Sequence, residues 1–256
     1  MNPVSLCYHD VIAAGDPDVS GFPGADAATY KLDLDLFRDH LDAIRQAAGK
    51  VEVRLTFDDG GSSAQPAIAD ELERRGFAGF FFITTDYIGQ PGFLSAKEIA
   101  ALHARGHAIG SHGCSHRGRM SSLPFDKLME EWARSCGILS GIIGAPVTCG
   151  SVPSGFYAPR VATAASEAGI RELYTQEPTS RCETIAGCMV RGRFTIRAWT
   201  DSRTVTALVR RDPFACIKAR AWWEVKELSK GVGGRAYTKV RRSFYRLTSV
   251  AASKHG

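Results

Sequence analysis

The residues with the clearest potential for chemistry are two pairs, Asp58 with Asp59 and His112 with His116. The aspartates follow residues 51–57, where apolar and polar side chains alternate as they do in a β-strand. Adjacent carboxylates raise the cost of ionising each other, a cost that a bound cation would offset. A turn on the surface is the alternative explanation, because Asp and Gly are common turn residues.

The histidines lie four residues apart, a spacing that puts both imidazoles on one face of a helical turn and suits two ligands of one metal ion. A histidine pair alone is weak evidence for a metal site. Both pairs, however, follow strand-like segments, and the carboxyl ends of parallel strands share one rim. His112, His116 and one aspartate would then form a two-histidine, one-carboxylate site, with the other carboxylate facing the substrate.

Such a site suits hydrolysis. A cation with three protein ligands keeps positions open for water and substrate, acidifies the water and polarises a carbonyl group. The spare carboxylate would take the proton from the water. Zn²⁺ fits these ligands best, while Co²⁺, Ni²⁺ and Fe²⁺ also bind histidine and carboxylate.

The rest of the chain predicts elements that could position these pairs. Strand-like runs alternate with amphipathic helical segments, which favours an α/β fold with a largely parallel sheet, either open or closed into a barrel. Ser95 and Glu98 have the spacing of a capping box at a helix start. The expected helices are 34–47, 63–76, 95–106, 124–144 and 160–170. The expected strands are 4–11, 51–57, 78–88, 107–112 and 171–176, with a further strand and loop over 145–157.

Two motifs in this order resemble the polysaccharide deacetylases of the NodB-homology type, carbohydrate esterase family 4. They are "TFDDG" at 56–60 and "SHGCSH" at 111–116, and the resemblance extends over roughly residues 4–200. It implies a distorted (β/α) barrel of seven or eight strands, with a catalytic domain at 1–204. Residues 205–256 are then expected to form a helical, basic C-terminal extension without a core of its own.

The resemblance also implies roles for the two pairs. Asp58 would be the catalytic base, and Asp59, His112 and His116 would hold the metal ion. The implied reaction is removal of N-acetyl groups from an amino sugar, oligosaccharide or polysaccharide by hydrolysis of a linear amide bond.

A third family motif, Arg-x-Pro-aromatic, is only partly kept in "SVPSG". Pro153 fits, but Ser151 stands at the arginine position and Ser154 at the aromatic one. Asp58 therefore lacks its usual orienting partner at this motif. The backbone N–H of Ser154 can still serve as an oxyanion donor, because a main-chain donor does not depend on the side chain.

The general acid departs from the common pattern as well. Many members supply a late histidine, whereas the sequence between His116 and His255 contains none. The circularly permuted exopolysaccharide deacetylases take this histidine from an N-terminal "YH", which "CYHDV" resembles. His9 would then protonate the leaving amine and Asp10 would tune or position it, with a structural histidine as the alternative.

Phe156 and Tyr157 follow the proposed oxyanion donor and are expected, with Pro153 and Asp10, to contact the substrate. Two rival functions stay open at this stage. One is hydrolysis of an O-acetyl ester or a non-sugar amide, and the other is a catalytically inactive saccharide-binding protein, for which the missing motif arginine would be the reason.

Composition limits the possible partners. The chain has a formal net charge of +5, and basic residues outnumber acidic ones from Arg191 onward. This favours a peripheral contact with an anionic membrane surface through 205–256, or simply a solvated basic face, and nucleic acid is not expected. No apolar run of about 18 residues predicts a membrane span, and the first residues do not resemble a secretory leader, so a cytoplasmic enzyme is expected.

Overall fold

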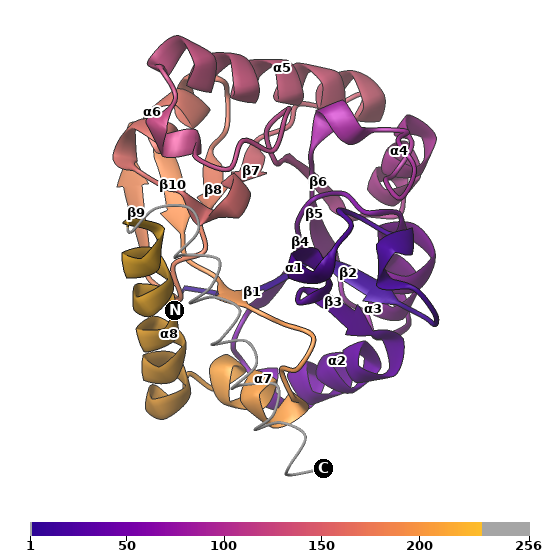
Figure 1. The fold of residues 1–256 in the computed structure, drawn as a ribbon. Coiled ribbons are helices and arrows are strands. Elements are labelled where there is room, and N and C mark those ends of the chain that lie inside the picture. Colours follow the sequence, from indigo (N-terminus) through magenta and orange to yellow (C-terminus); the bar gives the residue numbers. More distant parts are fainter. Residues whose placement is uncertain (1, 232–256) are drawn as a thin grey trace.

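The computed structural model describes residues 2–231; the last part of the expected extension, 232–256, lies outside the described residues. Its centre is a nine-stranded sheet curled into a barrel-like shape with helices around it, in the order β11-β1-β4-β5-β6-β7-β8-β10-β9 (Figure 1). The strands are β1 Val4–Tyr8, β4 Val53–Phe57, β5 Gly79–Ile83, β6 Ala108–Ser111, β7 Cys149–Ser151, β8 Glu172–Tyr174, β9 Cys182–Ile185, β10 Cys188–Arg191 and β11 Phe194–Thr195. Neighbouring strands are parallel except β9 and β10. The predicted α/β fold with a largely parallel, barrel-like sheet is confirmed.

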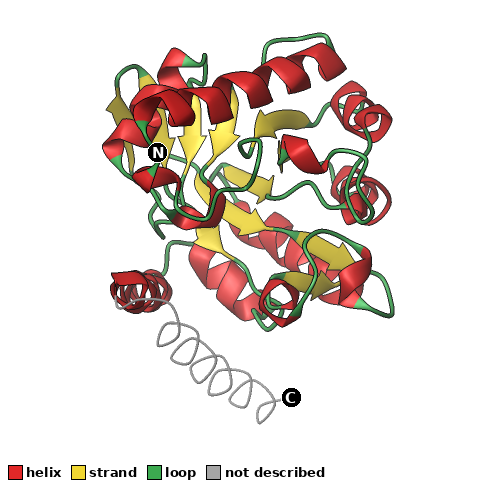
Figure 2. Ribbon diagram, turned by 45° about the horizontal axis from the view of Figure 1, so that its top comes forward, coloured by secondary structure: helices red, strands yellow, loops and turns green. Residues whose placement is uncertain are grey.

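The helices cover the outside of this sheet (Figure 2). Asp33 accepts hydrogen bonds from the backbone at the start of α2, and the predicted capping box of Ser95 and Glu98 begins α4. The helices are α1 Ala25–Ala28, α2 Leu34–Ala48, α3 Asp70–Arg74, α4 Ala96–Ala104, α5 Phe125–Ile143, α6 Pro159–Glu167, α7 Ser202–Val209 and α8 Pro213–Gly231. The segment expected to be a helix over 63–76 is helical from Ser62 to Arg74. It begins with a 3₁₀ turn and a π-helical turn, and only its last part, α3, is α-helical.

The alternating apolar and polar side chains of residues 51–57 lie on opposite faces of the sheet. Leu55 and Phe57 point to the apolar layer between sheet and helices, where Phe57 lies 5.6 Å from Tyr8 and 5.0 Å from Phe81 between ring centroids. The polar set faces the inside of the sheet's curve: Thr56 is fully buried there and accepts a hydrogen bond from an arginine described below. The period of two thus predicts both a core face and a polar interior face.

Two further regions shape the rim of the sheet. A small parallel sheet of β2 (Asp10–Ile12) and β3 (Lys31–Asp33) flanks residues 13–30, which contain a 3₁₀ turn at Pro17–Val19 and the short helix α1. The hairpin β9–β10 and the short β11 occupy 182–195, where the sequence patterns gave no expectation.

The boundary expected at 204/205 falls inside α7. Val205 and Leu208 of this helix belong to the same hydrophobic core as the sheet, so the described start of the extension packs with the barrel. Whether 205–256 forms a separate functional unit stays a prediction. No helix among residues 2–231 combines the length and apolarity that crossing a membrane requires.

Candidate active site

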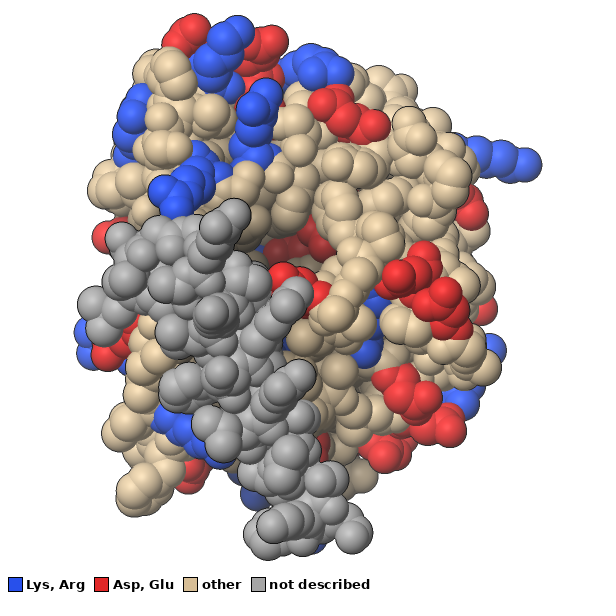
Figure 3. Space-filling view, viewed as in Figure 1, with Lys and Arg blue, Asp and Glu red and all other residues tan. Residues whose placement is uncertain are grey.

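The carboxyl ends of four parallel strands bring the predicted residues together. His9 follows β1, Asp58 and Asp59 follow β4, His112 follows β6, and Ser154 comes shortly after β7. Several of these side chains line a cavity of about 360 Å³, visible as a hollow on the face shown in Figure 3. The lining includes His9, Asp10, Phe22, Tyr30, Asp59, His112, His116, Ser154 and Phe156.

Asp59, His112 and His116 form a cluster whose spacing fits a divalent cation. Asp59 Oδ1 lies 3.4 Å from His112 Nε2 and 3.3 Å from His116 Nε2, and the ligand atoms of all three residues are within 4.8 Å of one another. Ligands about 2.0–2.2 Å from a tetrahedral zinc ion lie about 3.3–3.6 Å apart. Asp59 Oδ1 is buried and has no hydrogen-bond partner among residues 2–231, as expected of an atom reserved for an ion.

The electrostatics of the cluster favour an ionised carboxylate. Burial by itself would raise the pKa of Asp59, but electrostatic attraction to the facing imidazoles of His112 and His116 outweighs burial and holds this pKa well below its usual value. His112 Nδ1 donates a hydrogen bond of 2.9 Å to the carbonyl oxygen of Ser151. Because Nδ1 carries the proton, Nε2 of His112 is the free ligand atom.

The histidine pair does not lie on a helical turn, which corrects the sequence-based expectation. Residues 112–118 form a loop after β6, with Gly113 at φ +73° and His116 at φ +53°. The loop is held from α5 by Glu131, whose carboxylate accepts hydrogen bonds from the backbone N–H groups of Cys114 (2.8 Å) and Ser115 (3.0 Å). The i,i+4 spacing therefore identified the right pair through the wrong local geometry.

Replacing Glu131 by glutamine is expected to weaken divalent-metal affinity by about 10- to 100-fold, the usual effect of losing a group that positions metal ligands. The carboxylate accepts three hydrogen bonds from the loop, two from backbone N–H groups at Oε2 and one from the Ser115 hydroxyl at Oε1. The uncharged amide keeps one acceptor oxygen and weakens these bonds, so His116 would be held less firmly. Metal titration followed by calorimetry measures the effect. The matched control is Glu130→Gln, because Glu130 is an exposed neighbour on α5 that pairs with Lys127. Equal affinities for wild type and Glu131→Gln would contradict this role.

Asp58, the neighbour of the metal-ligand candidate Asp59, is paired with Arg193, which the sequence patterns did not single out. Arg193 Nη1 donates to Asp58 Oδ1 at 2.7 Å, and Arg193 Nη2 donates to Asp58 Oδ2 at 2.8 Å. Both side chains are fully buried. Burial would raise the pKa of Asp58, but the charge of Arg193, with contributions from neighbouring histidines, lowers it to about 2. Asp58 is therefore ionised and oriented in spite of the missing motif arginine.

Ser151 explains why arginine can reach Asp58 from another strand. Its small hydroxyl group lies 3.2 Å from Asp58 Oδ2 and accepts a 2.7 Å hydrogen bond from Arg193 Nη2. Arg193 arrives between β10 and β11, directly after Gly192, where a Cβ would lie 2.4 Å from the carbonyl oxygen of Glu177. The available signal was an arginine inside the apolar run that follows this glycine, "GRFTI".

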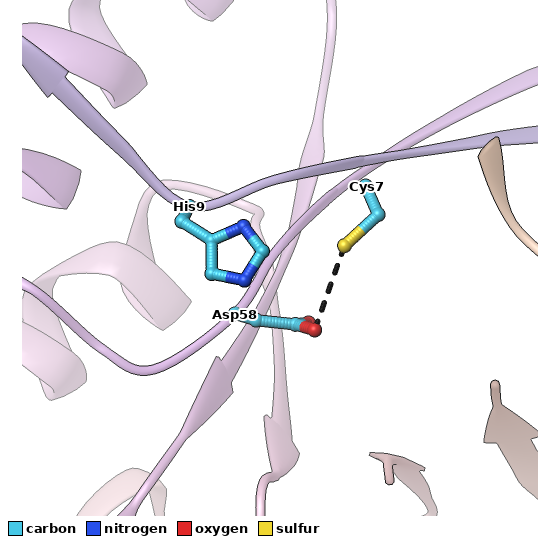
Figure 4. Close-up of side chains that lie close together, drawn as sticks. All are labelled: Cys7, His9 and Asp58. Carbon is cyan, nitrogen blue, oxygen red and sulfur yellow. Dashed lines mark hydrogen bonds between the residues drawn. The ribbon is translucent and has the colours of Figure 1, made fainter. Parts of the chain in front are cut away.

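His9 lines the cavity. Its side chain lies close to those of Asp58 and Cys7 (Figure 4). Its ring is 4.8 Å from that of Tyr30, and its Nδ1 is buried without a hydrogen-bond partner among the described residues. Burial lowers the pKa of His9, with nearby carboxylates opposing the shift. Cys7, His9 and Asp58 are close enough to hold a cation, but Arg193 already engages both Asp58 oxygens, so we place the metal at Asp59 instead.

The structure separates the remaining predicted residues. Ser154 and Phe156 line the cavity, whereas Pro153 and Tyr157 lie outside its described lining, and Tyr157 packs against the hydrophobic core. Asp10 borders the cavity, but its Oδ1 accepts hydrogen bonds from the hydroxyl groups of Ser20 (2.5 Å) and Ser63 (2.8 Å).

These two bonds tie Asp10 to residues 13–30 and to the turn after the aspartate pair. Cβ atoms at Gly21 and Gly61 would come within 2.1 Å and 2.0 Å of the Asp10 carboxylate. We therefore interpret Asp10 as a residue that holds the rim together, and its expected role beside His9 and the substrate stays a prediction.

Backbone strain is concentrated at the same cavity. Five non-glycine residues have positive φ among residues 2–231, and three of them, Asp59 (+76°), His116 (+53°) and Ser154 (+56°), line it. Left-handed backbone at such residues costs free energy and persists where the surroundings enforce it, as they often do at functional sites.

Comparison with known proteins now bears on this arrangement. The model of the family described as polysaccharide deacetylase matches residues 45–173, which include both the aspartate pair and the histidine loop. This chain belongs to the polysaccharide deacetylase family. The predicted relationship is thereby confirmed, and no curated protein matches the sequence.

Solved structures of deacetylases share the fold of this polysaccharide deacetylase. The Streptococcus pyogenes deacetylase PplD is 17% identical, with a TM-score of 0.67 over 79% of this chain and 96% of its own. IcaB from Ammonifex degensii is 22% identical, with a TM-score of 0.64 over 82% of this chain and 97% of its own. BC0361, a polysaccharide deacetylase from Bacillus cereus, is 18% identical, with a TM-score of 0.67 over 82% and 69% of the two chains. The predicted NodB-type barrel is confirmed.

Proposed function

We propose that this protein is a metal-dependent hydrolase that removes N-acetyl groups from an amino sugar or its polymer. The observation that carries the proposal is the pairing of two sites. A buried aspartate ionised by Arg193 lies directly beside a three-residue cluster with the spacing of divalent-cation ligands. Membership in the polysaccharide deacetylase family supports the reaction class.

Asp59, His112 and His116 would hold the cation, which when bound makes a water molecule more acidic and polarises the acetyl carbonyl group. Asp58 is the residue that accepts the proton from the attacking water. Its low pKa keeps it ionised at neutral pH, and Arg193 fixes the direction of its lone pairs.

His9 and Ser154 would complete the reaction from opposite parts of the rim. His9 donates a proton to the leaving amine, and its lowered pKa makes the protonated ring a stronger acid. The backbone N–H of Ser154 is assigned to the developing oxyanion, and Ser154 has a left-handed φ of +56°. The rings of Phe22, Tyr30 and Phe156 border the same cavity and suit the apolar faces of a sugar ring.

The rival functions differ in their support. The inactive saccharide-binding alternative depended on the missing motif arginine, and the contacts of Arg193 with Asp58 remove that reason. An O-acetyl ester or a non-sugar amide would use the same proton transfers, so this alternative depends on which substrates fit the cavity.

Metal analysis combined with acetate release tests the proposal. We expect one equivalent of a divalent metal ion, with release of acetate from N-acetylated saccharides that stops on chelation and returns on addition of Zn²⁺, Co²⁺, Ni²⁺ or Fe²⁺. The comparison substrates are O-acetylated saccharides, followed by acetate release, and small cyclic amides, followed by formation of the ring-opened amino acid. Turnover of only these substrates would favour the rival hydrolase, and saccharide binding without turnover of any substrate would contradict catalysis.

A further inference from the structure

Helix α8 carries an apolar stripe on its outer side. Phe214, Ile217, Ala221 and Val225, here called the outer stripe, follow the three- and four-residue spacing of one helix face. Phe214 is 83% exposed, Ile217 65% and Val225 42%, and they are three of the five large exposed hydrophobic side chains in the described chain. This contrasts with the usual scattering of single apolar residues over a protein surface.

The fold itself does not need the outer stripe. The opposite side of α8 packs against the hydrophobic core through Ala215, Cys216 and Ala219. Figure 1 shows α8 at the edge of the molecule. Because the inner side already anchors the helix, the exposed side chains are available to a partner.

The charges around the outer stripe indicate an anionic partner. Lys218 and Arg220 are exposed on α8, and the acidic neighbour Glu224 is paired with Arg220 at 3.0 Å. The sequence that follows, 232–256, contains six Lys or Arg residues and no Asp or Glu. Apolar side chains flanked by basic ones are typical of helices that lie in a lipid interface.

The position of α8 links this surface to the active site. The Arg197 guanidinium lies 5.3 Å from the ring centroid of Trp222 on α8 and 5.8 Å from that of Tyr30. Tyr30 in turn borders the cavity and contacts the ring of His9. A surface that receives α8 would therefore lie close to the wall of the cavity.

We propose that the outer stripe of α8 docks this protein onto an anionic lipid surface, with Phe214 and Ile217 inserted among the acyl chains and Lys218 near the headgroups. Residues 232–256 carry only basic charged side chains, and Lys218 and Arg220 beside the stripe are basic as well. Like charges oppose a second copy of the chain as the partner, whereas an anionic lipid is attracted to them.

Flotation of the full-length protein with lipid vesicles tests this proposal. The vesicles are phosphatidylcholine alone or phosphatidylcholine mixed with phosphatidylglycerol, at low and high salt. We expect binding only to the anionic vesicles, with binding weakened by salt. The double variant Phe214→Ser, Ile217→Ser should lower the partition coefficient at least about tenfold. The matched control is Phe125→Ser, because Phe125 is an exposed aromatic residue on α5 and is expected to leave binding unchanged.

Each other result overturns the proposal. Absence of binding at low salt excludes the lipid surface, and equal binding of wild type and the double variant excludes the outer stripe as the contact. Dimerisation that the double variant abolishes, without flotation, would assign the stripe to a contact between copies. Turnover of a water-soluble substrate, measured on the same samples, should be equal for all variants, so that failure of docking is distinguishable from failure of the proposed activity.

Discussion

Replacing Asp58 by asparagine is expected to lower kcat on an N-acetylated saccharide by about 10³-fold, within the usual range of about 10²–10⁴ for loss of a general base. The asparagine side chain has nearly the same shape, but its amide cannot accept the proton from water. Metal content should stay at one equivalent, because Asp59, His112 and His116 are unchanged. Initial rates of acetate release and elemental analysis of the same preparation check both parts.

The neighbouring variant Asp59→Asn provides the matched comparison. It is expected to lose activity to a similar extent, but through loss of bound metal, because Asp59 Oδ1 lies within 3.4 Å of both imidazole Nε2 atoms. Two adjacent aspartates would then give the same kinetic defect with opposite metal contents. Full activity in Asp58→Asn, or normal metal content in Asp59→Asn, would contradict the assignment of the two roles.

The sequence predicted those site residues that directly follow a recognisable strand pattern. The alternation of 51–57 specified a strand, the carboxylates came at its end, and parallel strands necessarily bring such ends to one rim. His112 was found in the same way. The i,i+4 rule failed for His116 because Glu131, which lies in a different helix, holds the loop in a non-helical path.

Arg193 could not be predicted for a different physical reason. Its partners Asp58 and Ser151 are 135 and 42 residues away in the chain, and its strand context is only a two-residue β11. Local patterns report which residues lie on one face of one element. They do not identify which residue of a distant strand will contact Asp58 across the interior of the curled sheet.

Replacing Arg193 by methionine is expected to lower the free energy of unfolding by about 3–5 kcal/mol and kcat by about 10²-fold. Methionine keeps much of the apolar stem but leaves the Asp58 carboxylate buried without its cationic partner. Neither side chain is accessible to solvent, so water cannot replace the lost hydrogen bonds. Chemical denaturation and initial rates measure the two effects. The control is Arg191→Met, since Arg191 pairs with Glu172 and not with Asp58, and this variant is expected to leave kcat unchanged.

A relocated arginine separates orientation of the base from general stability. The double variant Ser151→Arg, Arg193→Ser exchanges the two residues. The arginine then stands at position 151, the arginine position of the family motif, and the serine at position 193. Because Ser151 already contacts Asp58, an arginine there can reach the same carboxylate, and we expect part of the lost kcat to return.

In a double-mutant cycle of Asp58→Asn and Arg193→Met, the double variant should be more stable than additivity predicts, because it removes both members of one buried pair. Additive losses would mean that the two residues act independently, and Asp58 would then need another source of its orientation.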